Sequence, residues 1–148
     1  MIAHSERPAV VVDASVAVKW LVPAEHSAEA MRFLDPLILR HVPDLFYLEV
    51  AQTIWKKVHQ RSQLTVVEGR SVLAVLSKFP CEVHPATRSL EGAAFDLAIA
   101  SGRTVYDCTY LALARALGHP MVTADLKFFN ATRGGPFADD IRWVTDPD

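Results

Sequence analysis

Cysteine is scarce in this sequence, and long apolar runs are missing. The 148 residues include two cysteines, Cys81 and Cys108, which form neither a disulfide framework nor a Cys-x-x-Cys motif. This content is typical of a protein from a reducing compartment. No apolar run approaches the roughly 20 residues of a membrane-spanning helix, and the run at residues 9–12 is too short for the core of a signal peptide. We therefore expect a soluble, cytoplasmic protein with no membrane segment.

A marked excess of basic residues is also missing. The chain has 15 Lys and Arg residues against 17 Asp and Glu residues, and its formal net charge is −2. Broad nucleic-acid binders are usually basic, so the overall charge argues against that class but leaves room for a local basic groove. Because 51% of the residues are hydrophobic, the chain should fold rather than stay disordered. Its length predicts one domain over residues 1–148.

Short β-branched apolar runs alternate with longer helical segments along the chain. This pattern indicates an α/β domain with a mainly parallel sheet. We expect strands at residues 9–12, 40–42, 81–84, 121–123 and 141–144. We expect helices at residues 15–21, 25–39 (broken at Pro36), 45–61 (with Asp44 as N-cap), 65–79, 86–101 and 107–117, and a helical turn at 125–130.

Four carboxylates stand inside or directly after apolar segments. They are Asp13 in VVVD, Glu49 in LFYLEVA, Asp107 in VYDCTYLALA and Asp125 after MVTA. An isolated carboxylate in apolar surroundings is costly and tends to be protonated. Asp13 and Asp125 follow expected strands, whereas Asp107 and Glu49 lie near helix starts. In an open parallel sheet, ligands bind beyond the carboxyl ends of the strands, so the sequence allows all four acids to converge there.

Each acid taken alone also has an ordinary structural explanation. Asp13, Asp107 and Asp125 could each cap the following helix, and Glu49 could complement the dipole of its own helix. Taken together, converging carboxylates would repel unless they held a cation, and their hard oxygens suit Mg²⁺ or Mn²⁺. No His/Cys set has zinc-ligand spacing. Divalent ions held by carboxylates are suited to phosphodiester hydrolysis, and no Ser-His-Asp or Cys-His motif is apparent.

At these residues the sequence resembles the PIN-domain ribonucleases and, within them, the VapC-like toxins of bacterial toxin–antitoxin pairs. The segments that carry the resemblance are VVVDASV, VPDLFYLEVAQTIWK, VYDCTYLALARALG and MVTADLKF, in that order. The resemblance implies a three-layer α/β/α fold with a central parallel sheet of about five strands. It also implies metal-dependent endonucleolytic cleavage of RNA. Residues 1–8 would then be an N-terminal extension before the usual first strand.

The resemblance also assigns residues to roles. It places the family's acidic quartet on Asp13, Glu49, Asp107 and Asp125, as catalytic residues and ligands of Mg²⁺ or Mn²⁺. Two further polar positions of the family fall on Ser15 and Thr123, whose hydroxyls can orient a carboxylate or hold a metal-bound water; as plain capping or strand hydroxyls they would do neither. RNA needs positive contacts away from the metal. The candidates, if they are more than solvated surface charges, are Lys127, Lys56, Lys57 and Arg61.

The same resemblance implies a VapB-like antitoxin whose C-terminal segment blocks the site. The expected helices 45–61 and 65–79 carry apolar residues on more than one face, which is typical of buried or interface helices. We therefore expect a homodimer with an antitoxin groove nearby.

Other functions stay open at this point. The alternatives are a PIN-like nuclease in RNA processing outside toxin–antitoxin systems and a catalytically silent PIN-like binding module. A haloacid-dehalogenase-like phosphatase would need a second Asp at the position of Ser15. A dinucleotide-binding protein would need Gly-x-Gly-x-x-Gly after the first strand, and that motif is missing.

Overall fold

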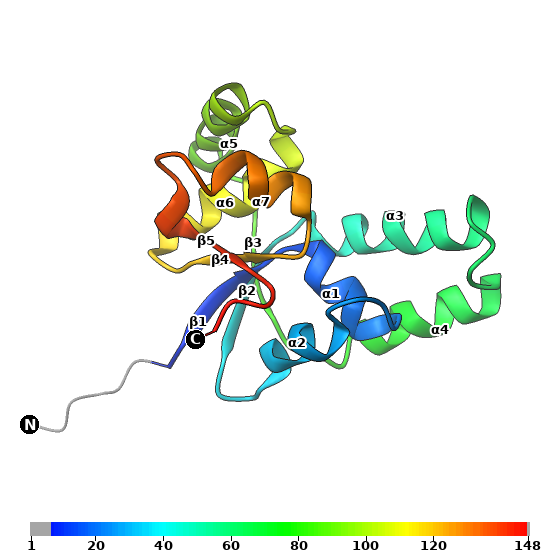
Figure 1. Ribbon diagram of the computed structural model, residues 1–148. Coiled ribbons are helices and arrows are strands. Elements are labelled where there is room, and N and C mark those ends of the chain that lie inside the picture. The colour runs from blue at the N-terminus through cyan, green and yellow to red at the C-terminus, as the bar shows by residue number, and fades with distance from the viewer. Residues whose placement is uncertain (1–6, 148) are drawn as a thin grey trace, which may run out of the picture.

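A five-stranded, fully parallel sheet forms the centre of the molecule in the computed structural model, which describes residues 7–147 (Figure 1). The strands run in the order β3-β2-β1-β4-β5. Their bounds are β1 Ala9–Val12, β2 Leu39–Pro43, β3 Glu82–His84, β4 Met121–Thr123 and β5 Ile141–Trp143. The structure therefore confirms the predicted α/β class with its parallel sheet of five strands.

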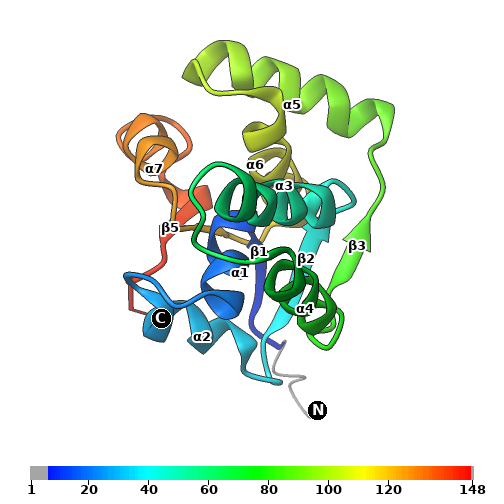
Figure 2. The same cartoon turned by 90° about the vertical axis from the view of Figure 1, so that its right-hand side faces the viewer.

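Helices cover both faces of this sheet and make the predicted three-layer α/β/α arrangement. Helix α6 packs on β1, β2 and β4, and α5 packs outside α6, whereas α1, α2 and α4 gather on the opposite side (Figures 1 and 2). The helices are α1 Ala14–Leu21, α2 Ser27–Met31, α3 Phe46–His59, α4 Val66–Leu76, α5 Arg88–Ser101, α6 Val105–Leu117 and α7 Leu126–Thr132, with 3₁₀ turns η1 Arg32–Leu34 and η2 Ala138–Asp140. None of the helices within residues 7–147 is long and apolar enough to cross a membrane.

The core explains why β1 is a continuous apolar run. Val10, Val11 and Val12 are all buried, because helices cover both faces of the strand. In contrast, α3 buries only one stripe, formed by Phe46, Val50 and Ile54. Asp13 directly follows this buried strand, so the fold itself carries this carboxylate to the carboxyl edge of the sheet.

Three of the predicted helices end earlier in the structure than predicted. The helix predicted at residues 25–39 is wrong over its second half: α2 and η1 end at Leu34. Beyond them, Asp35 accepts a hydrogen bond from the Leu37 amide at 2.9 Å. Pro36 disfavours helical geometry at the residue before it, so this polar turn leads directly into β2. The helix predicted at 45–61 ends at His59, and the helix predicted at 65–79 ends at Leu76.

The predicted cap at Asp44 is also wrong. Leu45 holds the N-cap position of α3. The Asp44 carboxylate instead accepts a hydrogen bond from the Ala86 amide at 3.2 Å, and the Asp44 amide donates to the His84 carbonyl at 2.9 Å. Asp44 therefore ties the start of α3 to the segment that leaves β3. Of the predicted N-terminal extension, residues 1–6 lie outside the described part of the chain.

Candidate metal-dependent active site

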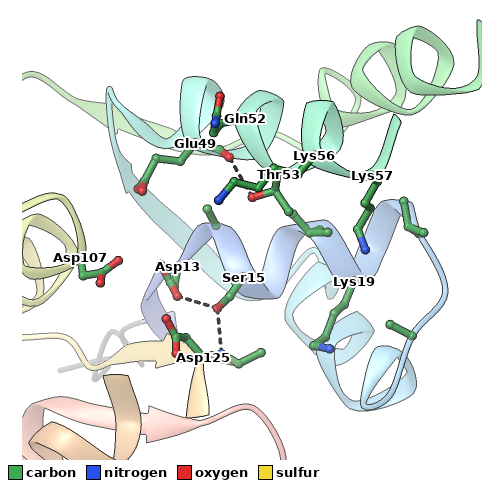
Figure 3. Close-up of a pocket in the computed structure, with 15 residues that line it drawn as sticks. Asp13, Ser15, Lys19, Glu49, Gln52, Thr53, Lys56, Lys57, Asp107 and Asp125 are labelled. Carbon is green, nitrogen blue, oxygen red and sulfur yellow. Dashed lines mark hydrogen bonds between the residues drawn. The ribbon is translucent and has the colours of Figure 1, made fainter. Parts of the chain in front are cut away.

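The four acids singled out in the sequence line one pocket of about 440 Å³. Asp13 follows β1, Asp125 follows β4, Glu49 lies in the first turn of α3, and Asp107 lies in the first turn of α6. Figure 3 shows Asp13 and Asp125 close together, with Asp107 on one side of them and Glu49 above. The structure thus brings together four carboxylates from widely separated parts of the chain, as the position of each relative to the strands predicts.

Asp13 is the most buried of the four acids, and two hydroxyl groups hold its carboxylate. Oδ2 of Asp13 accepts hydrogen bonds from Ser15 Oγ at 2.5 Å and from Thr123 Oγ1 at 2.9 Å. Burial raises the pKa of Asp13 to about 7; these two bonds oppose the shift, whereas the charges of Glu49 and Asp107 add to it. Asp13 occupies the N-cap position of α1 but does not use its side chain as a cap within the described chain. The capping explanation therefore fails for this residue.

Ser15 and Thr123 connect the first acid to the last. Ser15 Oγ accepts a hydrogen bond from the Ala124 amide at 2.9 Å, and Thr123 Oγ1 accepts one from the Asp125 amide at 3.1 Å. Both hydroxyls therefore donate to Asp13 while they accept from the backbone that carries Asp125. This network fixes the direction of the Asp13 carboxylate relative to the loop that follows β4.

Glu49 leaves a buried oxygen without a partner. Oε1 of Glu49 and the hydroxyl of Tyr110 are both buried, and neither has a hydrogen-bond partner among residues 7–147. Burial raises the pKa of Glu49; the nearby Tyr110 hydroxyl opposes the shift and the charge of Asp107 adds to it. An unpartnered buried acceptor is costly, and a bound cation would satisfy it. Our sequence analysis missed Tyr110, although its i+3 spacing from Asp107 places both on one face of α6.

Asp107 does not begin its helix, contrary to the prediction. Helix α6 begins at Val105 after the N-cap Thr104, whose hydroxyl accepts a hydrogen bond from the Asp107 amide at 3.1 Å. The Asp107 side chain is therefore released from capping and lines the pocket. Burial raises the pKa of Asp107, the Thr104 hydroxyl opposes the shift, and the charge of Asp125 adds to it.

Asp125 caps its helix with one carboxylate oxygen and also lines the pocket. Its Oδ1 caps α7 by accepting a hydrogen bond from the Phe128 amide at 3.1 Å. Its Oδ2 lies 4.0 Å from Nη2 of Arg103, which is also 3.5 Å from Oδ2 of Asp107. Different oxygens therefore cap the helix and face the other acids. Arg103 is a second residue that our sequence analysis missed; the signal was its i,i+4 spacing from Asp107.

The donor set fits a hard divalent cation. All four ligand candidates are carboxylates, burial raises the pKa of Asp13, Glu49 and Asp107, and their charges oppose one another's ionisation. Carboxylate oxygens are the preferred protein ligands of Mg²⁺ and Mn²⁺. A dication would remove the mutual repulsion and would favour the ionised form of each group.

A sequence profile of the PIN domain matches residues 10–134. The chain belongs to the PIN-domain family. Within this family the chain is 37% identical to Ribonuclease VapC3 of Pyrobaculum aerophilum over 118 residues, which cover 78% of this chain and 88% of that protein. PIN-domain nucleases generally use divalent metal ions. The family comparison confirms the resemblance to VapC-like PIN domains.

Solved structures of PIN-like folds agree with the architecture. The crystal structure of PAE2754 from Pyrobaculum aerophilum superimposes with a TM-score of 0.65 at 19% identity, covering 93% of this chain and 85% of that one. A toxin–antitoxin complex from Klebsiella pneumoniae gives a TM-score of 0.64 at 14% identity, covering 93% of this chain and 99% of the matched chain. At these identities the likeness shows the fold.

Basic side chains border one side of this PIN-domain pocket. Lys19, Lys56 and Lys57 all line it, and Figure 3 shows them along α1 and α3 beyond the acids. The other two basic candidates, Lys127 and Arg61, are exposed and are not among the described residues that line the pocket. Burial lowers the pKa of Lys57, and the charges of Arg61 and Lys19 lower it further. The pocket therefore has the four carboxylates on one side and a lysine wall, formed by Lys19, Lys56 and Lys57, on the other.

Proposed function

We propose that this PIN-domain protein is a Mg²⁺-dependent endoribonuclease, the toxin of a VapBC-type toxin–antitoxin pair, and that it acts in the cytoplasm. One observation carries the proposal: four carboxylates from four separate segments line one pocket beside three lysines. A phosphodiester substrate needs both features. The metal site would bind the scissile phosphate, and the lysines would attract the adjacent phosphates of the backbone. The similarity to a protein named Ribonuclease VapC3 supports RNA as the substrate.

Asp13, Glu49, Asp107 and Asp125 would hold Mg²⁺, with Mn²⁺ as a substitute. When bound, the metal supplies an activated water and neutralises charge on the phosphate. Ser15 and Thr123 keep the Asp13 carboxylate oriented by donating to its Oδ2. Glu49 offers a buried oxygen that no described residue uses. The chain therefore presents one buried carboxylate with a fixed direction, Asp13, beside partly buried ones, and the fixed group does not need to reorganise when the substrate arrives.

The lysine wall gives the RNA backbone its direction into the pocket. Lys56 and Lys57 lie on α3 beyond Glu49 and are suited to phosphates next to the cleaved bond. Lys127 and Arg61 would contact phosphates farther from the cut. Single-stranded loops are the expected targets, because the major groove of an A-form helix is too narrow for side chains to read.

The partner we propose is a VapB-like antitoxin, bound beside the pocket. Helices α3 and α4 form an apolar groove that includes Ile54, Trp55, Val58 and Leu73. The opposite face of α3 lines the acidic pocket, so a segment lying along this helix can reach the lysines and acids. The α3–α4 hairpin also extends away from the sheet (Figure 1). We further propose that the protein is a homodimer, since large apolar side chains such as Leu48, Phe95 and Ile99 are exposed on the chain.

RNA cleavage by antitoxin-free protein tests the proposal. Structured RNAs are incubated with Mg²⁺ or Mn²⁺, with EDTA as one control and Asp107→Asn as the inactive variant. Asp96→Asn serves as the matched control, because Asp96 is an exposed acid on α5 outside the pocket lining. We expect cleavage at defined sites by wild type and Asp96→Asn and none with EDTA or Asp107→Asn. Equal cleavage by wild type and Asp107→Asn would overturn the assignment of the site.

A further inference from the structure

A second cluster of potential metal ligands lies on the other side of β1 from β4, where β2 meets the edge strand β3. It consists of His41 on β2 and Glu82 and His84 on β3. One ligand atom from each residue lies within 4.8 Å of the other two. Figure 2 shows β3 beyond β2 at the edge of the sheet. None of the three residues is among those that line the acidic pocket in the described chain, so the proposed nuclease site does not account for this cluster.

Strand register explains why the three side chains meet. His41 is the direct neighbour of Glu82 in the parallel pairing of β2 with β3. Glu82 and His84 are two residues apart on one strand, and side chains at that spacing point to the same face. Neighbouring strands are only about 4.8 Å apart. The pairing therefore places two imidazoles and one carboxylate side by side on one face of the sheet.

The contacts within the cluster converge on one nitrogen of the buried residue His41. Nδ1 of His41 lies 2.9 Å from Nε2 of His84 and 3.2 Å from Oε2 of Glu82. A neutral imidazole carries one N–H and one acceptor nitrogen. If Nδ1 of His41 carries the proton, a single N–H faces two acceptor atoms. If it carries no proton, its lone pair faces a lone pair of the Glu82 carboxylate, and the two repel each other. A cation between the three groups would use all of these lone pairs at once.

The surroundings of His41 fix the direction of its ring. His41 is 5% exposed, and the ring of His119 stacks on it at a centroid distance of 5.7 Å and an interplanar angle of 10°. The side chain of Glu82, in contrast, is 59% exposed. One ligand is thus held in place inside the fold, while another stands in solvent where an ion can enter.

We propose that His41, Glu82 and His84 form a second metal site that binds Zn²⁺ or a similar transition-metal dication. Two imidazole nitrogens with one carboxylate oxygen are a known ligand set for zinc. Imidazole favours Zn²⁺ and its neighbours over Mg²⁺, whereas the all-carboxylate pocket has the opposite preference.

The site would fasten the edge of the sheet. Strand β3 has three residues, and edge strands of this length hold few ladder hydrogen bonds. The metal would link β3 to β2 through side chains, next to the point where Asp44 ties the end of β3 to the start of α3. Because the folded chain binds the ion and the unfolded chain has no preformed site, binding should raise the melting temperature.

Zinc binding to the full-length, metal-free protein tests the proposal. Zn²⁺ is titrated calorimetrically in the presence of excess Mg²⁺, which occupies the carboxylate pocket, and Co²⁺ is used separately as a spectroscopic probe of histidine ligation. The variants are His84→Ala and Glu82→Gln. His59→Ala is the matched control, because His59 lies on α3 and stacks on Trp55 outside the cluster.

We expect wild type and His59→Ala to bind one Zn²⁺ per chain and to melt at a higher temperature when Zn²⁺ is present. Even residues that only orient a metal ligand contribute about 10- to 100-fold to affinity, so His84→Ala should weaken binding at least about tenfold. If His84→Ala fails to fold, Glu82→Gln keeps the test open, because its side chain is exposed. Equal Zn²⁺ affinity in wild type, His84→Ala and Glu82→Gln would overturn the proposal.

Discussion

The acidic pocket and the His41–Glu82–His84 cluster are assembled in different ways. The pocket draws its carboxylates from residues just beyond β1 and β4 and from the first turns of α3 and α6. The cluster draws its ligands from the middle of β2 and from the first and last residues of β3. One depends on where strands end, and the other depends on how strands pair. The two sites also offer different atoms, oxygens only in the first and mainly nitrogens in the second, so each should select its own metal.

The strongest test of the pocket separates the two functions of Asp125. Asp125→Asn keeps an N-cap residue but removes the charge. RNA cleavage should therefore fall about 10³-fold, which corresponds to several kcal/mol of metal-dependent transition-state stabilisation. The stability of the folded protein should stay near that of wild type. Asp125→Ala should lose the same activity and, in addition, about 1 kcal/mol of unfolding free energy. Cleavage rates and urea denaturation measure the two effects. Full activity in Asp125→Asn would mean that capping is the whole role of this residue.

Asp13 gives the metal-free protein an unusual dependence on pH. The folded pKa is raised from 3.8 to about 7, so the folded state keeps a proton that the unfolded chain releases between these values. The contribution of Asp13 to stability should therefore be fully present below pH 4 and should be lost as the pH rises to 7, by at most about 1.4 kcal/mol per pH unit. Denaturation in EDTA across this range measures the slope.

Two controls sharpen this pH prediction. Asp13→Asn should flatten the slope, because the group no longer titrates, and Mg²⁺ should restore the stability of wild type above pH 7. The histidine cluster should have the opposite effect on stability. Burial lowers the pKa of His41, so its contribution to the free energy of unfolding is lost as the pH falls below the ordinary histidine pKa. An unchanged slope in Asp13→Asn would show that Asp13 does not titrate in this range.

Arg103 competes with a metal for two of the acids. Its guanidinium lies 3.5 Å from Asp107 and 4.0 Å from Asp125, so Arg103→Gln should tighten Mg²⁺ binding severalfold. The effect should stay below about tenfold because these side chains are partly exposed and screened. Calorimetry measures it, with Arg88→Gln on α5 as the matched control. Zn²⁺ affinity should not change in either variant, and weaker Mg²⁺ binding in Arg103→Gln would contradict this role.

The lysine wall should show the smallest effect, in the salt dependence of RNA binding. Lys56→Gln removes a residue of the pocket wall and should reduce the slope of log affinity against log salt by about 1. Arg61→Gln, outside the pocket lining, should change the slope less. Binding is measured with Asp107→Asn as the background, so that the RNA stays intact. A larger change in Arg61→Gln than in Lys56→Gln would place the RNA on a different path.

Much of the pocket could be predicted because its signals are local. A buried carboxylate after an apolar strand is anomalous in the sequence itself, and chain order places Asp13 and Asp125 at the same edge of a parallel sheet. Ser15 and Thr123 were singled out by the resemblance to the PIN-domain family, and both hydroxyls donate to Asp13 in the structure. Predictions that concerned caps were less successful: Thr104, rather than Asp107, caps α6, because the helix begins at Val105 and the Thr104 hydroxyl accepts a hydrogen bond from the Asp107 amide.

The histidine cluster could not be predicted because its signal is not local. His41 and Glu82 meet through the register of two strands that are separated by α3 and α4, and a one-residue slip would send the side chains to opposite faces. Zinc-ligand spacing in the sequence is therefore a poor guide when ligands lie on paired strands. Tyr110 and Arg103 lie about one helical turn from Asp107, but that spacing alone does not show that they also come near acids from other segments, Glu49 and Asp125.

Anomalous diffraction from a crystal soaked in both Mn²⁺ and Zn²⁺ is the most direct test of the account, with Mn²⁺ standing in for Mg²⁺. Data at the two absorption edges identify each metal and its ligands in one molecule. The account predicts Mn²⁺ among Asp13, Glu49, Asp107 and Asp125. It predicts Zn²⁺ among His41, Glu82 and His84. A pocket without Mn²⁺ at saturating concentration would contradict the central claim that the four carboxylates form a divalent-metal site.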